Sequence, residues 1–161
     1  MFHSHLEAIL YVNRFFKLHK VIEFGPGSRS TEFFLREIKE LKKLISLENQ
    51  THFGNIVRNR FGEDSRWKLI IKNENKLLEV AKSHAKCDLL LIDGETIAGR
   101  NKVIQIAGEL SDLAIVHDTE NGNYDKELSK YKHRKIFSKD KYPKACLFSN
   151  VIDVNNLENE N

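Results

Sequence analysis

The chain of 161 residues is poor in the residues and segments that mark secreted and membrane-bound proteins. It has only two cysteines, Cys87 and Cys146, which are too few and too far apart for a disulfide framework or a metal knuckle. No apolar run reaches the ~18 residues that a membrane-spanning helix needs. Residues 1–7 lack the basic region and the cleavage site of a signal peptide. We therefore expect a cytoplasmic protein with no membrane partner.

Length and composition are those of an ordinary globular domain. Of the 161 residues, 40% are hydrophobic and 30% are charged, and the formal net charge is only +3. Such a chain can bury one sizeable core, and no repeat, linker or low-complexity segment divides it. We predict a single domain over residues 1–154, followed by a polar tail over residues 155–161 that frays.

Strand-like and helix-like segments alternate along the chain, with a new strand roughly every 22–25 residues. Strands are predicted at residues 21–24, 44–47, 67–71, 88–92 and 113–116, and helices at residues 6–18, 31–43, 52–61, 75–85, 99–110 and 124–131. The last two strand-like segments, 134–137 and 145–154, have only a short link between them, which indicates a hairpin. The pattern predicts an α/β, Rossmann-like fold. Its seven-stranded sheet would be mostly parallel, with an antiparallel C-terminal hairpin and helices on both faces.

The most informative segment is the turn that follows the first predicted strand. Glu23 lies in this strand, Gly25 and Gly27 form the turn with a proline between them, and Ser30 stands where the next helix opens. Glycines let backbone N–H groups approach a ligand closely, and the start of a helix favours negative charge. A dinucleotide fingerprint has a third glycine at the position of Ser30, so that pattern is incomplete here. The turn predicts a nucleotide-type ligand site.

Polar residues also follow the second and third predicted strands. Glu48 and Asn49 come at the end of the second strand, where a carboxylate can accept hydrogen bonds from both hydroxyls of a ribose. Asn73 and Glu74 follow the third strand. Either of these two can hold an adenine amine or cap the helix that comes next.

The fourth strand ends in Ile-Asp-Gly at residues 92–94, and the fifth ends in His-Asp at residues 117–118. Together with the Glu-x-Gly-x-Gly turn at residues 23–27 and with Glu48, these motifs resemble the class I S-adenosylmethionine-dependent methyltransferases. The resemblance is greatest to a small, O-methyltransferase-like group and covers residues 21–119. Five βα units followed by a hairpin are also the layout of the class I methyltransferase fold.

The resemblance implies that S-adenosylmethionine is the cofactor. The residues it would place around this cofactor come from four strand ends: Glu23, Gly25, Gly27, Ser30, Glu48, Asn49, Glu74 and Asp93. The implied reaction is methyl transfer to an oxygen of a small molecule, which can be an anionic one.

Two departures from the family pattern keep other functions open. Arg29 stands where the family has its third glycine, and the histidine that relatives often carry shortly after the Asp-Gly pair is missing. The first alternative is a non-catalytic Rossmann-like module that binds an adenosine ligand or a partner protein. The second is a nicotinamide-dependent enzyme.

Three residues at the fourth and fifth strand ends are candidates for the chemistry. Asp93 and Asp118 can share one hard cation such as Mg²⁺, as carboxylates at these strand ends do in some relatives, and Glu120 or Asn121 can complete its ligands. His117 is a candidate general base, because its ordinary pKa lies near neutrality. The alternatives are structural: Asp93 caps its own loop, and His117 packs in the core.

Two charged features bear on the substrate and on partners. Arg100, on the helix after the fourth strand, is expected to be solvated rather than to reach an anionic substrate. Residues 126–144 are rich in lysine and arginine, which can attract an acidic substrate or a nucleic-acid backbone. The low net charge argues against nucleic acid without excluding it. A small-molecule substrate is the expected partner, and the sequence leaves the oligomeric state open.

Overall fold

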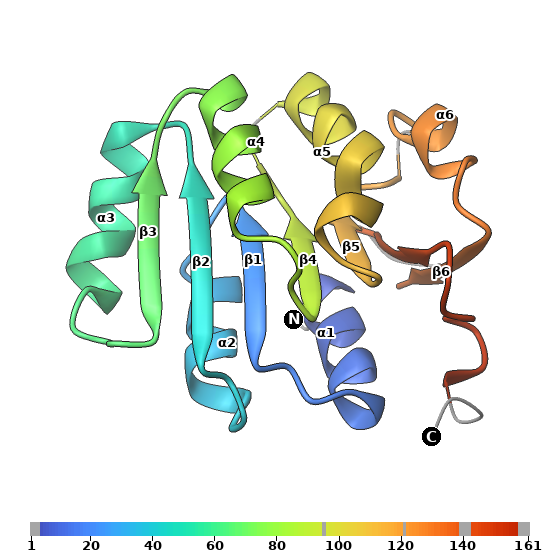
Figure 1. Ribbon diagram of the computed structural model, residues 1–161, viewed down its shortest axis with the longest axis horizontal. Coiled ribbons are helices and arrows are strands. Elements are labelled where there is room, and N and C mark those ends of the chain that lie inside the picture. The colour runs from blue at the N-terminus through green and yellow to red at the C-terminus, as the bar shows by residue number, and fades with distance from the viewer. Residues whose placement is uncertain (1–3, 95, 121, 139–142, 158–161) are drawn as a thin grey trace.

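One seven-stranded sheet forms the centre of the computed structural model, which describes residues 4–94, 96–120, 122–138 and 143–157 (Figure 1). The strands lie in the order β3-β2-β1-β4-β5-β7-β6. Their bounds are β1 Lys20–Phe24, β2 Lys43–Glu48, β3 Trp67–Ile71, β4 Leu89–Ile92, β5 Ala114–His117, β6 His133–Phe137 and β7 Ala145–Ser149. β7 runs antiparallel to both β5 and β6, whereas the other described pairings are parallel, so the predicted mostly parallel sheet with a C-terminal hairpin is confirmed.

Of the helices that the structure describes, three cover each face of the sheet. One face carries α1 (Ser4–Phe15), α2 (Ser30–Glu37) and α3 (Thr51–Phe61), whose apolar side chains pack into a first core cluster. The other face carries α4 (Glu74–Ser83), α5 (Ile97–Leu110) and α6 (Asp125–Leu128), which pack into a second cluster. Successive strand residues alternate between the two clusters; in β4, for example, Leu89 and Leu91 belong to the first and Leu90 and Ile92 to the second.

Two predicted boundaries differ most from the structure, each because backbone groups find other partners. The second helix was expected to reach residue 43, but α2 ends at Glu37. The backbone N–H of Lys43 instead donates to the carbonyl of His19, which starts the β1–β2 pairing. The last strand was expected to reach residue 154, but β7 ends at Ser149. The Ser149 hydroxyl accepts hydrogen bonds from the next backbone N–H groups, at Val151 and Ile152, and so closes a turn.

Burial in the core continues past the boundary predicted at residue 154. Val154 is fully buried, and Leu157, which falls within the tail that was expected to fray, is fully buried as well. Residues 158–161 lie outside the described residues. Cys87 and Cys146 are both buried and free. None of the helices that the structure describes combines the length and the apolar character needed to cross a membrane.

The core packing predicts a large cost for a cavity in β4. Leu90 is fully buried, and Leu90→Ala should lower the free energy of unfolding by ~2–5 kcal/mol. The matched control is Val151→Ala, because the Val151 side chain is 66% exposed and its loss should change stability by only about 0.5 kcal/mol. Urea unfolding followed by circular dichroism measures both. Equal effects of the two substitutions would contradict this packing.

Candidate functional site

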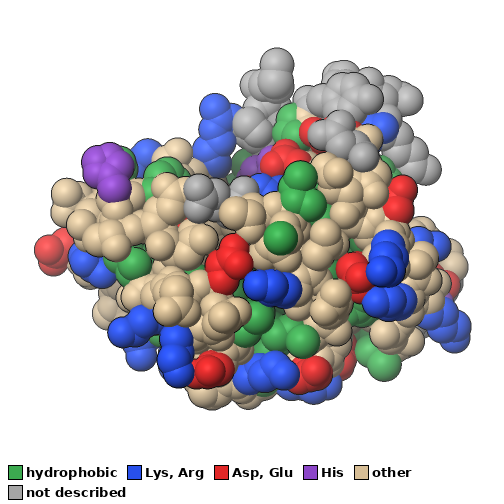
Figure 2. All heavy atoms as spheres, turned by 90° about the horizontal axis from the view of Figure 1, so that it is seen from above, with side chains coloured by type: hydrophobic (Ala, Val, Ile, Leu, Met, Phe, Trp, Pro, Cys, Tyr) green, Lys and Arg blue, Asp and Glu red, His purple; other side chains and the backbone are tan. Residues whose placement is uncertain are grey.

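The connections of the sheet create a crevice at one edge. The chain moves outward from β1 to β2 and β3 and then returns to the other side of β1 to form β4. Ligands of open α/β sheets bind at such a reversal, outside the carboxyl ends of the strands. Figure 2 looks onto this edge and shows acidic, basic and histidine side chains around a central hollow.

A pocket occupies this crevice on the side of α4 and α5. Its enclosed volume is about 40 Å³, with wider space at its open mouth. It is lined by Phe24, Gly25, Leu47, Glu48, Asn49, Glu74, Leu77, Leu78, Ile92, Gly94, Thr96, Gly99, Arg100, Lys102 and Val103. The wall therefore combines apolar side chains with a few charged ones. Four of the predicted cofactor-binding residues, Gly25, Glu48, Asn49 and Glu74, are among them.

Gly25 meets the strongest steric constraint in the pocket. Its φ of +77° is a conformation that residues with a side chain rarely adopt. A Cβ built on Gly25 would lie 2.1 Å from the carbonyl oxygen of Asp93, so the backbones after β1 and β4 touch here. Gly27 has no such requirement, because its nearest contact would be the Ser30 hydroxyl at 3.6 Å. Only the first glycine of the turn is required by the geometry.

Glu23 lies beneath the glycine turn and does not line the pocket. Its side chain is fully buried, and Oε1 accepts hydrogen bonds from the hydroxyls of Thr31 at 2.7 Å and Ser46 at 2.5 Å. Burial raises the pKa of Glu23 to about 7, although the hydroxyls of Ser46, Thr31 and Ser30 oppose the rise. Trp67 Nε1 donates to the Ser46 hydroxyl and so extends the network to β3. Glu23 and Ser30 therefore join β1, β2 and the start of α2 rather than reaching into the pocket.

Glu48, the last residue of β2, and Asn49, which follows it, both line the pocket. The Glu48 carboxylate is only 5% exposed. Its Oε1 accepts hydrogen bonds from the backbone N–H groups of Asn49 at 2.8 Å and Gln50 at 2.7 Å. These bonds hold the carboxylate in one orientation against the turn before α3.

Glu74 connects α4 to α5 across the pocket wall. Its carboxylate accepts a hydrogen bond from the Thr96 hydroxyl at 2.8 Å and lies 3.5 Å from the ammonium group of Lys102. Asn73 takes the alternative role foreseen for it, because its side chain accepts from the Lys76 backbone N–H and caps α4. Thr96 also caps α5 by accepting from the backbone N–H of Gly99. Glu74 therefore remains the candidate for a contact with an adenine amine.

The three predicted catalytic residues lie together at the ends of β4 and β5. Nδ1 of His117 is 3.2 Å from Oδ1 of Asp93 and 3.4 Å from Oδ1 of Asp118. Asp118 adopts a left-handed backbone conformation with φ of 57°, which turns the chain sharply after β5. The side chains of Asp93 and Asp118 are 23% and 40% exposed, so both carboxylates reach the surface of the crevice.

Arg100 lies at the centre of this group, contrary to the expectation that it is solvated. Its side chain is only 10% exposed, and its guanidinium is 3.0 Å from Asp118 and 3.4 Å from Asp93. It donates further hydrogen bonds to the carbonyls of Gly94 and His117 and to the hydroxyl of Tyr124. A Mg²⁺ ion shared by Asp93 and Asp118 stays a prediction, and the structure places this guanidinium against both carboxylates.

The two carboxylates beside His117 favour the charged form of its imidazole. Burial alone lowers the pKa of its imidazole, but the hydrogen bond and charge of Asp93, with the charge of Asp118, outweigh burial and raise the pKa. Its other ring nitrogen, Nε2, is buried without a hydrogen-bond partner among the residues that the structure describes. Nδ1 faces carboxylates and Nε2 is inaccessible to solvent, so direct proton abstraction from a substrate by His117 would require the side chain to move.

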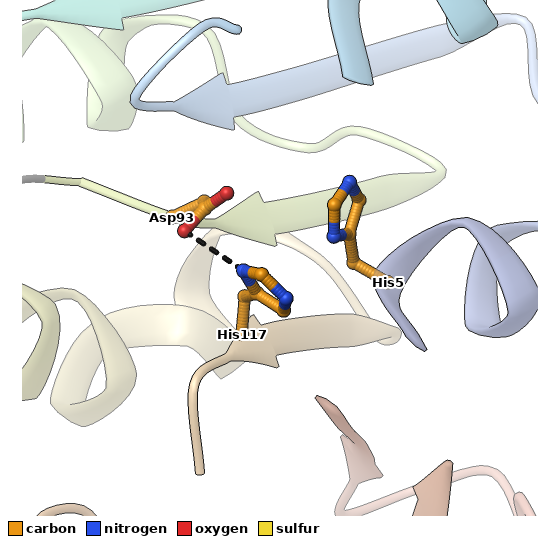
Figure 3. Close-up of side chains that lie close together, drawn as sticks. All are labelled: His5, Asp93 and His117. Atoms are coloured by element: carbon orange, nitrogen blue, oxygen red, sulfur yellow. Dashed lines mark hydrogen bonds and ion pairs between the residues drawn. The ribbon is translucent and has the colours of Figure 1, made fainter. Parts of the chain in front are cut away.

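His5, which sequence reasoning did not select, packs against this group from the first turn of α1 (Figure 3). Its ring is 4.4 Å from that of His117, centroid to centroid, in an edge-to-face arrangement. One ligand-type atom from each of His5, Asp93 and His117 lies within 4.8 Å of the others. The sequence places His5 next to an amphipathic helix. The apolar pattern of that helix does not predict which strand ends it covers, so it does not predict that His5 lies beside His117.

The remaining candidates lie apart from the pocket or outside the described residues. The Glu120 carboxylate accepts a hydrogen bond from the backbone N–H of Lys144 and so faces the start of β7. Asn121 and the part of the basic segment at residues 139–142 are not among the described residues. In the described part of the basic segment 126–144, Lys130 pairs with Glu127, and Lys135 lies over the Tyr11 ring.

No protein-family model and no curated protein sequence matches the chain, but its fold is similar to that of solved structures. A spermidine synthase from Thermotoga maritima superposes with a TM-score of 0.69 and 17% identity, over 94% of this chain and 61% of that protein. A methyltransferase from Geobacter sulfurreducens has a TM-score of 0.66 and 13% identity, over 93% of this chain and 80% of that one. A putative tRNA (m1A22) methyltransferase from Streptococcus pneumoniae has a TM-score of 0.63 and 12% identity, over 92% of this chain and 70% of its own length.

These similarities establish the fold predicted from the motifs. The chain has the Rossmann-like, class I methyltransferase fold, with helices on both faces of the sheet. It spans only about three fifths of the length of the spermidine synthases that it matches, at 61% and 60%.

The contact of Gly25 with Asp93 predicts that Gly25→Ala damages the pocket. The new methyl group would meet the Asp93 carbonyl, and the positive φ would add ~1–3 kcal/mol of strain, so stability should fall by at least ~2 kcal/mol. The control is Gly108→Ala on α5, where a Cβ meets nothing within 4 Å and should stabilise the helix by ~0.5–1 kcal/mol. Thermal and urea unfolding measure both. A harmless Gly25→Ala would show that the two backbones do not touch.

The buried Glu23 predicts a specific pH dependence of stability. Its pKa is about 7 in the folded protein and 4.5 as its ordinary value, so between these values the folded state holds a proton that the unfolded state has lost. Stability should therefore fall as pH rises through this window, by about 3 kcal/mol in total. The neutral variant Glu23→Gln should lose this component. Urea unfolding from pH 4.5 to 8 compares the two, and parallel curves would rule out a raised pKa.

Proposed function

We propose that the protein binds S-adenosylmethionine in the pocket between α4 and α5 and transfers its methyl group to an oxygen of a small molecule. The observation that carries the proposal is the contact of Gly25 with Asp93 beside the buried Glu48 carboxylate. A turn without a Cβ and a fixed acceptor group meet at the point where the strand order reverses.

The residues of the pocket suit an adenosyl ligand. Glu48 is held by two backbone N–H groups, and its carboxylate is positioned to accept ribose hydroxyls. Asn49 and Glu74 add polar groups on the same side, while Leu77 and Val103 provide apolar surface for a flat ring. Glu23 and Ser30 would act indirectly, because they fix the strand and the helix on either side of the glycine turn.

The acceptor would lie on the other side of the strand ends, beside Asp93 and Asp118. Bound S-adenosylmethionine supplies an electrophilic methyl group, so the protein has to position the acceptor oxygen and receive its proton. Asp93 and Asp118 are the accessible carboxylates that would receive that proton, and the Arg100 guanidinium lies beside both. His117 would orient Asp93 through the bond between Nδ1 and Oδ1. Arg100 already donates to several protein groups, so an anionic substrate would have to be held by other residues.

A second candidate is transfer of a group to an amine. The same two carboxylates, partly exposed at the crevice, would attract a cationic acceptor. The structural similarity to a spermidine synthase agrees with this possibility. Both candidates require an S-adenosyl ligand in the same pocket, so ligand binding is the first test and the acceptor the second.

Ligand binding can be tested by thermal unfolding with S-adenosylmethionine, S-adenosylhomocysteine or NAD, each with and without Mg²⁺. A ligand at about 100 times its Kd stabilises the folded state by ~2.7 kcal/mol, a shift of roughly 5–10 °C for a chain of this size. We expect shifts with the two S-adenosyl compounds and none with NAD. A shift with NAD alone would favour a nicotinamide-dependent enzyme. No shift with any of the three would contradict the proposal.

The same assay locates the ligand. Glu48→Gln removes the charge that strengthens hydrogen bonds to the ribose and should weaken S-adenosylmethionine binding by roughly 10–100-fold. Glu79→Gln is the matched control, because Glu79 lies on α4 with its side chain 66% exposed. Equal affinities of the two variants would place the ligand elsewhere. Tight binding without transfer to any hydroxyl or amine acceptor would leave a non-catalytic module.

A further inference from the structure

We propose that His5, Asp93 and His117 form a binding site for a transition-metal ion such as Zn²⁺. One ligand-type atom of each residue lies within 4.8 Å of the others, and the three side chains converge from α1, the end of β4 and the end of β5 (Figure 3). Two imidazoles and one carboxylate suit Zn²⁺, Co²⁺ or Fe²⁺ better than Mg²⁺, which prefers an all-oxygen set. The site differs from a Mg²⁺ site on Asp93 and Asp118 in both its ligands and its metal.

Nδ1 of His117 and Oδ1 of Asp93 already lie at the spacing of two ligands of one ion. The two atoms are 3.2 Å apart, close to the separation of neighbouring ligands around a Zn²⁺ ion with bonds of about 2.0–2.2 Å. An ion held by both atoms would replace the hydrogen bond between them, because Nδ1 has to give up any proton that it carries.

His5 brings the second imidazole from a distant part of the chain. It is 4% exposed on the first turn of α1, and its ring contacts the His117 ring edge to face. The helix that carries it packs on β5 and β7, so its position is fixed by the core. Ligands of one ion at 2.0–2.1 Å lie roughly 3.3 Å apart, so the farthest pair here would draw together by up to about 1.5 Å.

Arg100 does not remove Asp93 from this site. Its guanidinium is 3.4 Å from Oδ1 of Asp93, whereas its bonds to the Gly94 and His117 carbonyls and to Asp118 are shorter, at 2.5, 3.1 and 3.0 Å. The guanidinium is therefore anchored mainly by other groups. A carboxylate has two oxygens and about four acceptor positions, so Asp93 can keep its contact with Arg100 and still bind an ion.

The site can be tested by metal binding alone, without an activity assay. The tag-free full chain is freed of metal with a chelator and titrated with Co²⁺, whose visible absorption reports its ligands, and then with Zn²⁺ in competition. We expect one ion per chain, displaced by Zn²⁺ and not by Mg²⁺. X-ray absorption of the Zn²⁺-loaded wild-type protein should show two imidazole nitrogens and at least one oxygen. This measurement needs no variant, so misfolding of a substituted protein cannot obscure the answer.

Variants then identify the ligands. His5→Gln, Asp93→Asn and His117→Gln should each weaken Co²⁺ binding at least tenfold, with folding checked by circular dichroism. His52→Gln, at an exposed histidine on α3, and Asp118→Asn, beside the site, should bind as the wild type does. The proposal is overturned if the wild type binds no ion, or if Asp118→Asn abolishes binding while His5→Gln leaves it intact. None of these outcomes depends on S-adenosylmethionine, so the metal site and the proposed function can fail separately.

Discussion

The buried guanidinium of Arg100 holds the two halves of the site together. From α5 it reaches the loop after β4 through the Gly94 carbonyl, the end of β5 through His117 and Asp118, and the start of α6 through Tyr124. A cation only 10% exposed is stable here because it lies against two carboxylates. The same contacts bring Asp93 and Asp118 close enough to share His117, which two uncompensated negative charges would resist. The strand ends can therefore present two carboxylates side by side.

The alternation of apolar strands and amphipathic helices was sufficient to predict the architecture. Strands such as Leu89–Ile92 are buried on both faces, and nearly continuous apolar runs of this length indicate a central parallel sheet. The ends of helices and strands were less predictable. The segment after Glu37 leaves the helix and pairs with the backbone at His19, and the segment after Ser149 leaves the strand in a turn that the Ser149 hydroxyl closes. Local propensity does not contain those partners.

The site could be predicted in part, since parallel strands bring their carboxyl ends to one edge. That rule alone places Gly25, Glu48, Asp93 and His117 near one another, and the structure does so. It could not predict which way side chains on the covering helices point. Arg100 and His5 lie on helices, and their burial depends on how α5 and α1 pack on the sheet. Glu23 was predicted from its motif to contact the ligand. Its carboxylate instead accepts hydrogen bonds from hydroxyls on the neighbouring α2 and β2.

The packing of α1 has a consequence for how the chain reaches this state. The first helix covers β5, β6 and β7, which come from the second half of the chain, and the Tyr11 hydroxyl donates to the carbonyl of Val154, 143 positions away. During synthesis the N-terminal helix leaves the ribosome long before the surface it covers exists. The apolar face of α1 therefore stays exposed, or bound to a chaperone, until β7 pairs between β5 and β6. The domain can therefore complete its core only after β7 and Val154 have been made.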